Sequence, residues 1–272
     1  MAQNIYKKPI FLNSVIHKSV KVAPVVNYKF GKELNSVVIV GQEFLEAAKT
    51  YPVVFVKGKN SEIIPVAILG LRNDENLFVD EEGVWKEGAY VPAFFRRYPF
   101  ILASNVGEDG SFAVCCDSQH EGFDKKEGMT LFDEEGNQSE EFKKVVEFLK
   151  NYQVQNENTR EMIKSLEENK LFKDISANIT LPAGEKLGFG GMMMVDEMAI
   201  LQLEDDKILN LVRKGFLAWV YAHLYSLSNF RSLMSLASLT ETGSNVSKPD
   251  SSEKKTSTES SKEKKTAVAK KE

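Results

Sequence analysis

The sequence predicts an α+β fold: an antiparallel, β-rich amino-terminal half, helices at about 137–170 and 205–238, and a disordered carboxy-terminal tail. Three observations support this prediction. Short apolar runs alternate with turn residues up to residue 117, apolar residues recur at helical spacing after residue 136, and large apolar residues nearly vanish from residue 240 onward. We therefore expect one globular domain over residues 1–239 and a tail over residues 240–272 that buries too little to become ordered.

Strands and tight turns account for most of the first half. Runs rich in β-branched and aromatic residues, bounded by turn-forming residues, predict an antiparallel meander, with a short helix beside it. The turn signal at 107–110 lies between two further apolar runs and predicts a hairpin. The expected segments are a helix at 42–49 and strands at 53–56, 63–71, 77–79, 100–104 and 112–116.

Helical periodicity begins after Gly136. Phe142, Val145, Val146 and Leu149 recur at helical spacing, and Asn137, with an acidic residue three positions later, resembles an amino-terminal cap. Later segments are expected in the order helix 159–170, strand 175–181, a turn at 182–184, strand 192–203, helix 205–224 and helix 228–238.

Charge and hydropathy exclude several classes of protein. Thirty-five Lys and Arg against 39 Asp and Glu give a formal charge of −4, which offers no attraction to nucleic acid or to an anionic membrane. No apolar run approaches the ~20 residues that a membrane-spanning helix needs. The amino terminus lacks the apolar core and the cleavage site of a secretory signal. These features predict a cytoplasmic protein that binds no nucleic acid and has no membrane span.

Common catalytic and metal-binding motifs are missing. Cys115 and Cys116 are adjacent, so we expect two reduced thiols that act as small apolar residues. His17, His120 and His223 lie far apart in sequence, and none belongs to a His-Glu-x-x-His motif. The acidic turns do not follow the order of an EF-hand loop, and neither a Gly-x-Ser-x-Gly motif nor a phosphate-binding loop occurs. The sequence therefore predicts no metal site and no cofactor.

The most distinctive segment is 90–100, Tyr-Val-Pro-Ala-Phe-Phe-Arg-Arg-Tyr-Pro-Phe. Its prolines predict an extended, irregular backbone, and its arginines are suited to aromatic faces or to a carboxylate. Two interpretations stay open: a pocket for a peptide or an anionic group, and a buried ion pair with Asp196 or Glu197. His223, on an apolar helix, is expected to be a core or helix-end residue. The candidate binding residues are Tyr90, Phe94, Phe95, Arg96, Arg97, Tyr98, Asp196, Glu197 and His223.

The order of several motifs resembles the SapC family of bacterial proteins. They are segment 90–100, Leu-Phe-Asp-Glu-Glu-Gly at 131–136 before a helix with Phe148-Leu149, Val-Asp-Glu at 195–197, and the aromatic-rich stretch 215–227. The similarity covers roughly residues 11–239. The family takes its name from a locus for surface-layer (S-layer) proteins, beside components of a type I export system. The resemblance implies an accessory role in producing or exporting a surface protein, with the S-layer protein or the export components as partners, and it implies no reaction.

Three functional hypotheses follow. The leading one is a cytoplasmic, non-enzymatic binding protein that engages an S-layer polypeptide or its export machinery. The second is an enzyme that modifies a peptide or a glycan, with a site assembled from Arg96, Arg97, Asp196, Glu197 and His223. The third is an oligomeric structural subunit, because the last two helices display more apolar surface than one core requires.

Overall fold

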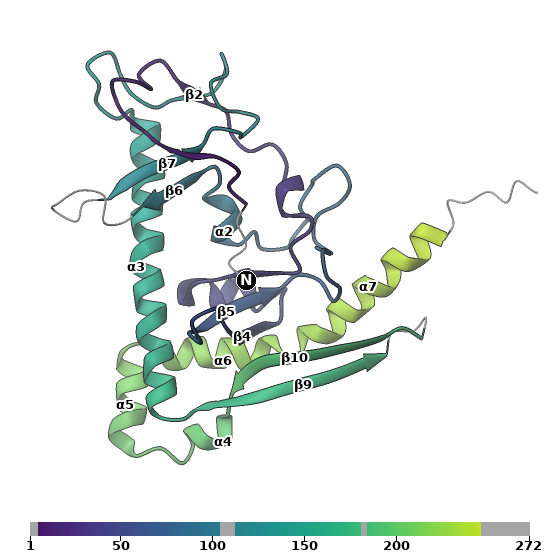
Figure 1. Ribbon diagram of the computed structural model, residues 1–272. Helices are drawn as coiled ribbons and strands as arrows, with labels where there is room; N and C mark the ends of the chain where they lie inside the picture. Colours follow the sequence, from purple (N-terminus) through teal and green to yellow (C-terminus); the bar gives the residue numbers. More distant parts are fainter. Residues whose placement is uncertain (1–4, 104–111, 181–183, 246–272) are drawn as a thin grey trace, which may run out of the picture.

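Seven α-helices and ten strands form the part of the chain that the computed structural model describes, residues 5–103, 112–180 and 184–245 (Figure 1). The strands make a five-stranded, a three-stranded and a two-stranded sheet, and every printed strand pair is antiparallel. The expected α+β class is therefore confirmed. Among the described residues, no helix combines the length and the apolar character needed to cross a membrane.

The five-stranded sheet has the order β3-β5-β4-β10-β9. Its strands are β3 (Ser36–Val38), β5 (Ile63–Ile68), β4 (Val53–Lys57), β10 (Lys186–Val195) and β9 (Phe172–Thr180). Val53, Val54 and Phe55 are all fully buried, although successive side chains of a strand point to opposite faces. Both faces of β4 are therefore covered by other elements, and this strand lies at the centre of the larger of two hydrophobic cores.

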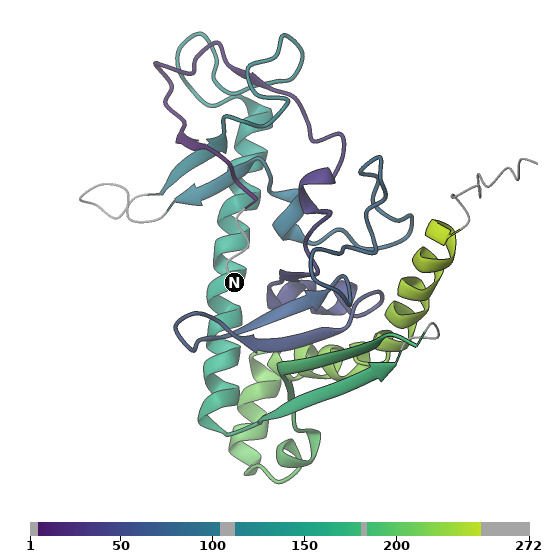
Figure 2. The ribbon, with the colours of Figure 1, turned by 45° about the vertical axis from the view of Figure 1, so that its right-hand side comes forward.

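The smaller sheets lie together at the other end of the molecule (Figure 2). The three-stranded sheet contains β1 (Pro9–Phe11), β7 (Ala113–Asp117) and β6 (Phe100–Ala103), in that order; the two-stranded sheet pairs β2 (Lys21–Val22) with β8 (Met129–Thr130). Phe100, Cys116, Leu131 and Phe142 belong to a second, smaller hydrophobic core at this end.

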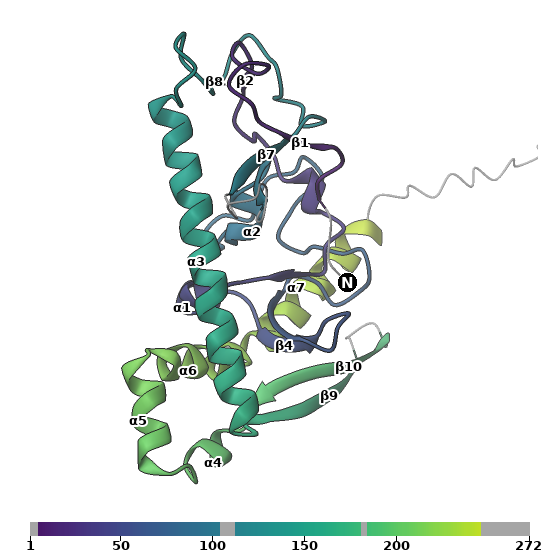
Figure 3. The same cartoon turned by 60° about the vertical axis from the view of Figure 1, so that its left-hand side comes forward.

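Helix α3 (Glu140–Glu168) runs along both cores (Figure 3). It begins after Ser139, whose hydroxyl accepts a hydrogen bond from the backbone N–H of Phe142 at 3.1 Å. Phe142 and Leu149 in its first half pack in the smaller core, whereas Leu166 near its end packs in the larger one. The helix therefore connects the two hydrophobic cores.

The remaining helices follow β10 or are short. The carboxy-terminal ones are α4 (Glu197–Ile200), α5 (Asp205–Arg213), α6 (Phe216–Ser226) and α7 (Asn229–Asn245). The short elements are the 3₁₀ turns η1 (Lys29–Gly31) and η2 (Gly41–Glu43), with the single-turn helices α1 (Phe44–Ala47) and α2 (Ala93–Arg96). Helix α6 contacts α1, β4 and β10, so it covers one face of the large sheet.

Most expected elements are present, and the differences have local causes. Residues 77–79 form only an isolated bridge from Val79 to Trp85, because the side chain of Asn76 takes up the backbone N–H of Phe78 at 2.9 Å. The strand expected at 192–203 ends at Val195, where the Asp196 carboxylate accepts from the N–H of Met198 and starts α4.

The helix boundaries also differ from those expected. The two helices predicted between 137 and 170 are one, and its cap is Ser139 instead of Asn137. The helix expected over 205–224 divides at Gly215, whose φ of 74° lies in the left-handed region that glycine adopts readily. Helix α7 continues to Asn245. The turn at 107–110, residues 182 and 183, and the tail from residue 246 lie outside the described residues.

Candidate binding site around Tyr98

Segment 90–100 forms a helical turn instead of a wholly extended stretch. Pro92 precedes the single turn of α2, and a cis peptide bond joins Tyr98 to Pro99 before β6 begins. Phe94, Phe95 and Tyr98 are buried, whereas Arg96 is exposed and Arg97 is half-buried. The rings of Phe94, Phe95 and Tyr98 anchor the segment in the larger core, whereas the two arginines lie closer to the surface of the molecule.

A buried carboxylate fixes the start of this segment. Glu43, at the end of η2, accepts hydrogen bonds from the N–H of Val40 at 3.0 Å, the N–H of Ala93 at 2.6 Å and the hydroxyl of Tyr90 at 2.9 Å. The Tyr90 hydroxyl in turn accepts from Nη2 of Arg96 at 2.9 Å, and Nε of Arg96 donates to the Val91 carbonyl at 3.0 Å. Glu43 thereby determines the position of Tyr90 and, through it, of Arg96.

Arg97 lies among aromatic rings. Its guanidinium carbon is 4.9 Å from the ring centroid of Phe94 and 4.9 Å from that of Tyr152 on α3. Burial raises the pKa of the Tyr6 hydroxyl to about 12, and the neighbouring Arg97 charge partly offsets this increase. Nε of Arg97 is buried without a hydrogen-bond partner, and no carboxylate of the described residues lies within 4 Å of either adjacent arginine. Aromatic rings therefore stabilise the positive charge of Arg97, whereas a carboxylate stabilises that of Arg72.

A second buried carboxylate holds the other end of the segment. Asp117, at the end of β7, accepts from the N–H groups of Lys7, Lys8 and Gln119 at 2.9, 2.8 and 3.1 Å and from the Tyr98 hydroxyl at 3.3 Å. Burial opposes ionisation of Asp117, but these hydrogen bonds outweigh it and lower the pKa of the carboxyl group. Burial and the Asp117 charge both raise the pKa of Tyr98. The phenol therefore stays neutral and donates to the carboxylate.

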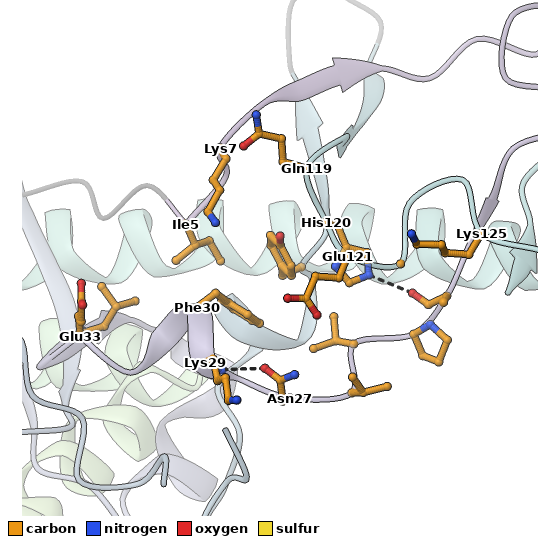
Figure 4. A pocket seen from close by; sticks show the side chains of 17 residues that line it. Ile5, Lys7, Asn27, Lys29, Phe30, Glu33, Gln119, His120, Glu121 and Lys125 are labelled. Carbon is orange, nitrogen blue, oxygen red and sulfur yellow. Dashed lines mark hydrogen bonds between the residues drawn. The ribbon is translucent and has the colours of Figure 1, made fainter. Parts of the chain in front are cut away.

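Two cavities flank Tyr98. The first has a volume of about 720 Å³ and is lined by Phe30, Tyr98 and residues 119–122, among others (Figure 4). The second has a volume of about 620 Å³ and is lined by both arginines, residues 98–100 and Phe148 of α3. Both volumes are within the range of small-ligand sites.

The two cavities share one wall. Ala23, Pro24, Val25 and Tyr98 line both of them. We call residues 23–27, the connection between β2 and η1, the strap. Its first residue is held twice: the N–H of Ala23 donates to Gly122 at 2.8 Å, and its carbonyl lies 3.0 Å from Nε2 of His120.

The three carboxy-terminal candidates lie elsewhere. His223 is fully buried in α6, where Nδ1 donates to the Val53 carbonyl at 2.7 Å and Nε2 accepts from the N–H of Val195 at 3.1 Å. Burial lowers its pKa to about 4. Asp196 pairs with Lys173 at 3.1 Å, which lowers the pKa of Asp196, and Glu197 is exposed in the first turn of α4.

The structure therefore brings together only part of the expected site. Tyr90, Phe94, Phe95, Arg96, Arg97 and Tyr98 gather around α2, whereas Asp196, Glu197 and His223 lie at the distant end of β10 (Figure 1). The expected ion pair between an arginine of segment 90–100 and Asp196 or Glu197 is wrong, because Lys173 is closer in the β9–β10 hairpin and takes that role. Within the described ranges, His, Cys, Asp and Glu side chains nowhere gather in a group of three that could hold a metal ion.

Sequence reasoning missed Glu43, Asp117 and the strap. Both carboxylates stand within apolar runs, Val-Gly-Gln-Glu-Phe-Leu and Val-Cys-Cys-Asp, and an acidic residue in such a run was the available signal. The strap, with the sequence Ala-Pro-Val-Val-Asn, has no distinguishing composition.

Comparison with known proteins agrees with the motif order. A family model described as SapC matches residues 12–233, which include segment 90–100, the strap and both buried carboxylates. No curated protein and no solved structure matches the chain. Since the match covers most of the sequence, the chain belongs to the SapC family.

Proposed function

We propose that the protein is a non-enzymatic binding protein of the cytoplasm that engages a surface-layer polypeptide or a component of its export machinery. The observation that carries this proposal is the placement of Arg96 and Arg97. Both guanidinium groups are held by aromatic rings and line an apolar cavity, and neither pairs with a carboxylate of the described chain. Such groups are available for an anionic partner.

The alternative, an enzyme that modifies a peptide or a glycan, receives less support from the geometry. Its proposed residues lie at two separate places, and both ring nitrogens of His223 are engaged by backbone atoms. A general base must reach the proton that it removes, and His223 is fully buried. The surface-layer association itself rests on the family.

Crosslinking in native lysate tests the proposal. We expect the wild-type protein to be crosslinked to a surface-layer protein or an export component, and the double variant Arg96→Ala/Arg97→Ala to lose that product. The matched control is Arg213→Ala/Arg231→Ala, which removes two exposed guanidinium groups outside both cavities. The thermal unfolding midpoint identifies a variant that merely fails to fold, and Arg96→Ala alone changes only the exposed arginine.

Two results would contradict the proposal. One is an unaltered surface layer after deletion of the gene, together with no crosslink to the surface-layer protein or to the exporter. The other is turnover of a peptide or glycan substrate that a single substitution among Arg96, Arg97 or His223 abolishes while the chain stays folded.

A further inference from the structure

The strap offers backbone groups that the rest of the described chain does not use. The N–H groups of Val25, Val26 and Asn27 donate no hydrogen bond within the described residues, and the carbonyl groups of residues 24–27 accept none there. The strap has no regular secondary structure, and Val26 is 83% exposed. An accessible stretch of free donors and acceptors is what an added strand pairs with.

Both cavities adjoin the strap: residues 23–27 line the first and residues 23–25 line the second. Successive side chains of an extended chain point to opposite sides. Because the strap forms a wall of both cavities, a segment lying along it could place alternate side chains into the two cavities. Their linings are largely apolar, with Phe30, Leu34 and Tyr98 in the first and Tyr98, Phe100 and Phe148 in the second.

The charges around this surface favour an acidic partner. The two linings together contain six cationic side chains and three carboxylates, although the whole chain has a net charge of −4. The cations are Lys7, Lys29, Lys125, Arg96, Arg97 and Lys144; the carboxylates are Glu33, Glu121 and Glu141. None of the six cations forms an ion pair with a carboxylate among the described residues. Figure 4 shows Lys7 and Lys125 on opposite sides of the first cavity, with Glu121 between them.

We infer that the strap binds an extended, acidic polypeptide segment as an added β-strand, with alternate apolar side chains in the two cavities and carboxylates on the surrounding cations. This inference rests on the proposed function, because it specifies the kind of polypeptide that the protein engages. Backbone pairing supplies affinity that does not depend on side-chain identity, while the cavities and the cations select apolar and acidic residues.

Selection of peptides tests the inference with a defined probe. A library of random 12-residue peptides displayed on phage is selected against the full chain and counted by sequencing. We expect the enriched peptides to contain acidic residues and alternating apolar residues. No enrichment, or enrichment of basic peptides, overturns the inference.

Charge reversal then locates the bound peptide. In anisotropy titrations of an enriched, fluorescein-labelled peptide, we expect Lys125→Glu and Lys144→Glu each to weaken binding roughly tenfold. The matched controls are Lys126→Glu, beside Lys125, and Lys150→Glu, on the same helix as Lys144. Both control lysines are exposed and lie outside both cavities. Equal affinity for all four variants shows that the peptide binds elsewhere and overturns the inference.

Backbone methylation tests the added strand itself. Two forms of the same peptide, N-methylated at odd or at even positions, block opposite edges of an extended chain. We expect one form to lose binding and the other to retain it, because only one edge faces the strap. Retention by both forms excludes backbone pairing. If a peptide passes these tests but the protein is crosslinked to no surface-layer partner, only the proposed function is refuted. If the crosslink forms but no peptide passes these tests, only the inference is refuted.

Discussion

At the scale of single residues, buried ionisable groups hold the fold together through backbone atoms. His223 joins α6 to the end of β10 and to β4, and its low pKa keeps the ring neutral in the folded state. The unfolded chain binds this proton below about pH 6.5, whereas the folded chain binds it only below about pH 4. Protons therefore favour the unfolded state between these values, and stability is lost as the pH falls through this window.

We expect the contribution of His223 to decrease by about 1.4 kcal/mol per pH unit between pH 6.5 and pH 4 and to be complete above pH 6.5. Urea unfolding at pH 7.5 and pH 5.0 measures this change. His223→Gln should lower stability at pH 7.5 and make the free energy of unfolding depend less on pH between pH 7.5 and pH 5.0. An identical slope in His223→Gln and wild type would show that another group titrates.

Glu43 provides a second test at this scale. Glu43→Gln keeps the side-chain volume but replaces one acceptor oxygen with an NH₂ group, which cannot accept from Ala93, Val40 or Tyr90. A buried donor is then left facing a donor, so we expect a loss of about 2–3 kcal/mol in unfolding free energy. Glu46→Gln in the following helix α1 removes only an exposed pair with Lys49 and should change stability by less than about 0.5 kcal/mol. Equal small effects of both substitutions would refute the anchoring role of Glu43.

At the scale of elements, η2 is a tight junction between two helices. The N–H of Gly41 donates to the hydroxyl of Thr159 on α3 at 2.8 Å, and a Cβ atom at Gly41 would lie 2.2 Å from the Trp219 ring on α6. Gly41→Ala must displace that ring, and we expect a loss of about 1–3 kcal/mol. Gly190→Ala is the control, since no atom lies within 4 Å of the position of its Cβ. The test compares the free energies of unfolding of the two variants. An unchanged value for Gly41→Ala would show that α6 can move aside without a loss of stability.

Elements with a simple period were predictable from the sequence, and elements that depend on distant contacts were not. Strands β4 and β5 and the β6–β7 pair follow from apolar runs and turn residues alone. Helix α3 was divided in the prediction because its apolar stripe weakens between Leu149 and Thr159, where it passes from one core to the other. A regular apolar period indicates a helix that packs against one surface. A helix that packs against two surfaces in turn has an interrupted apolar period.

The candidate site shows the same division. Composition identified the aromatic and guanidinium side chains of segment 90–100, since they are adjacent in sequence. Their two carboxylate anchors lie far along the chain: Glu43 accepts from Ala93 across 50 positions, and Asp117 accepts from Lys8 across 109 positions. Neither partnership has a sequence spacing that a local pattern could reveal. The strap could not be predicted from the sequence, because its distinguishing feature is a set of unpaired backbone groups, and side-chain identity does not show which backbone groups are unpaired.

At the scale of the whole molecule, the strap and the second cavity lie where the two cores meet. The second cavity is lined by Val22 and Phe100 of the smaller core and by Tyr98 of the larger one, and the strap connects β2 with η1 across this junction. A segment bound there contacts both parts at once. Independent opening of the smaller core would therefore weaken the binding surface without unfolding the large sheet.

Two substitutions on one helix test whether the cores open separately. Leu149→Ala removes a buried side chain from the smaller core, and Leu166→Ala removes the same side chain from the larger one; each should cost about 2–5 kcal/mol in the core that it affects. By hydrogen exchange with mass spectrometry, we expect Leu149→Ala to accelerate exchange in β6 and β7 while β4 and β5 stay protected. Leu166→Ala should accelerate exchange in β4 and β5. Uniform acceleration in both variants would show that the molecule unfolds as one unit and that α3 transmits every loss between the two cores.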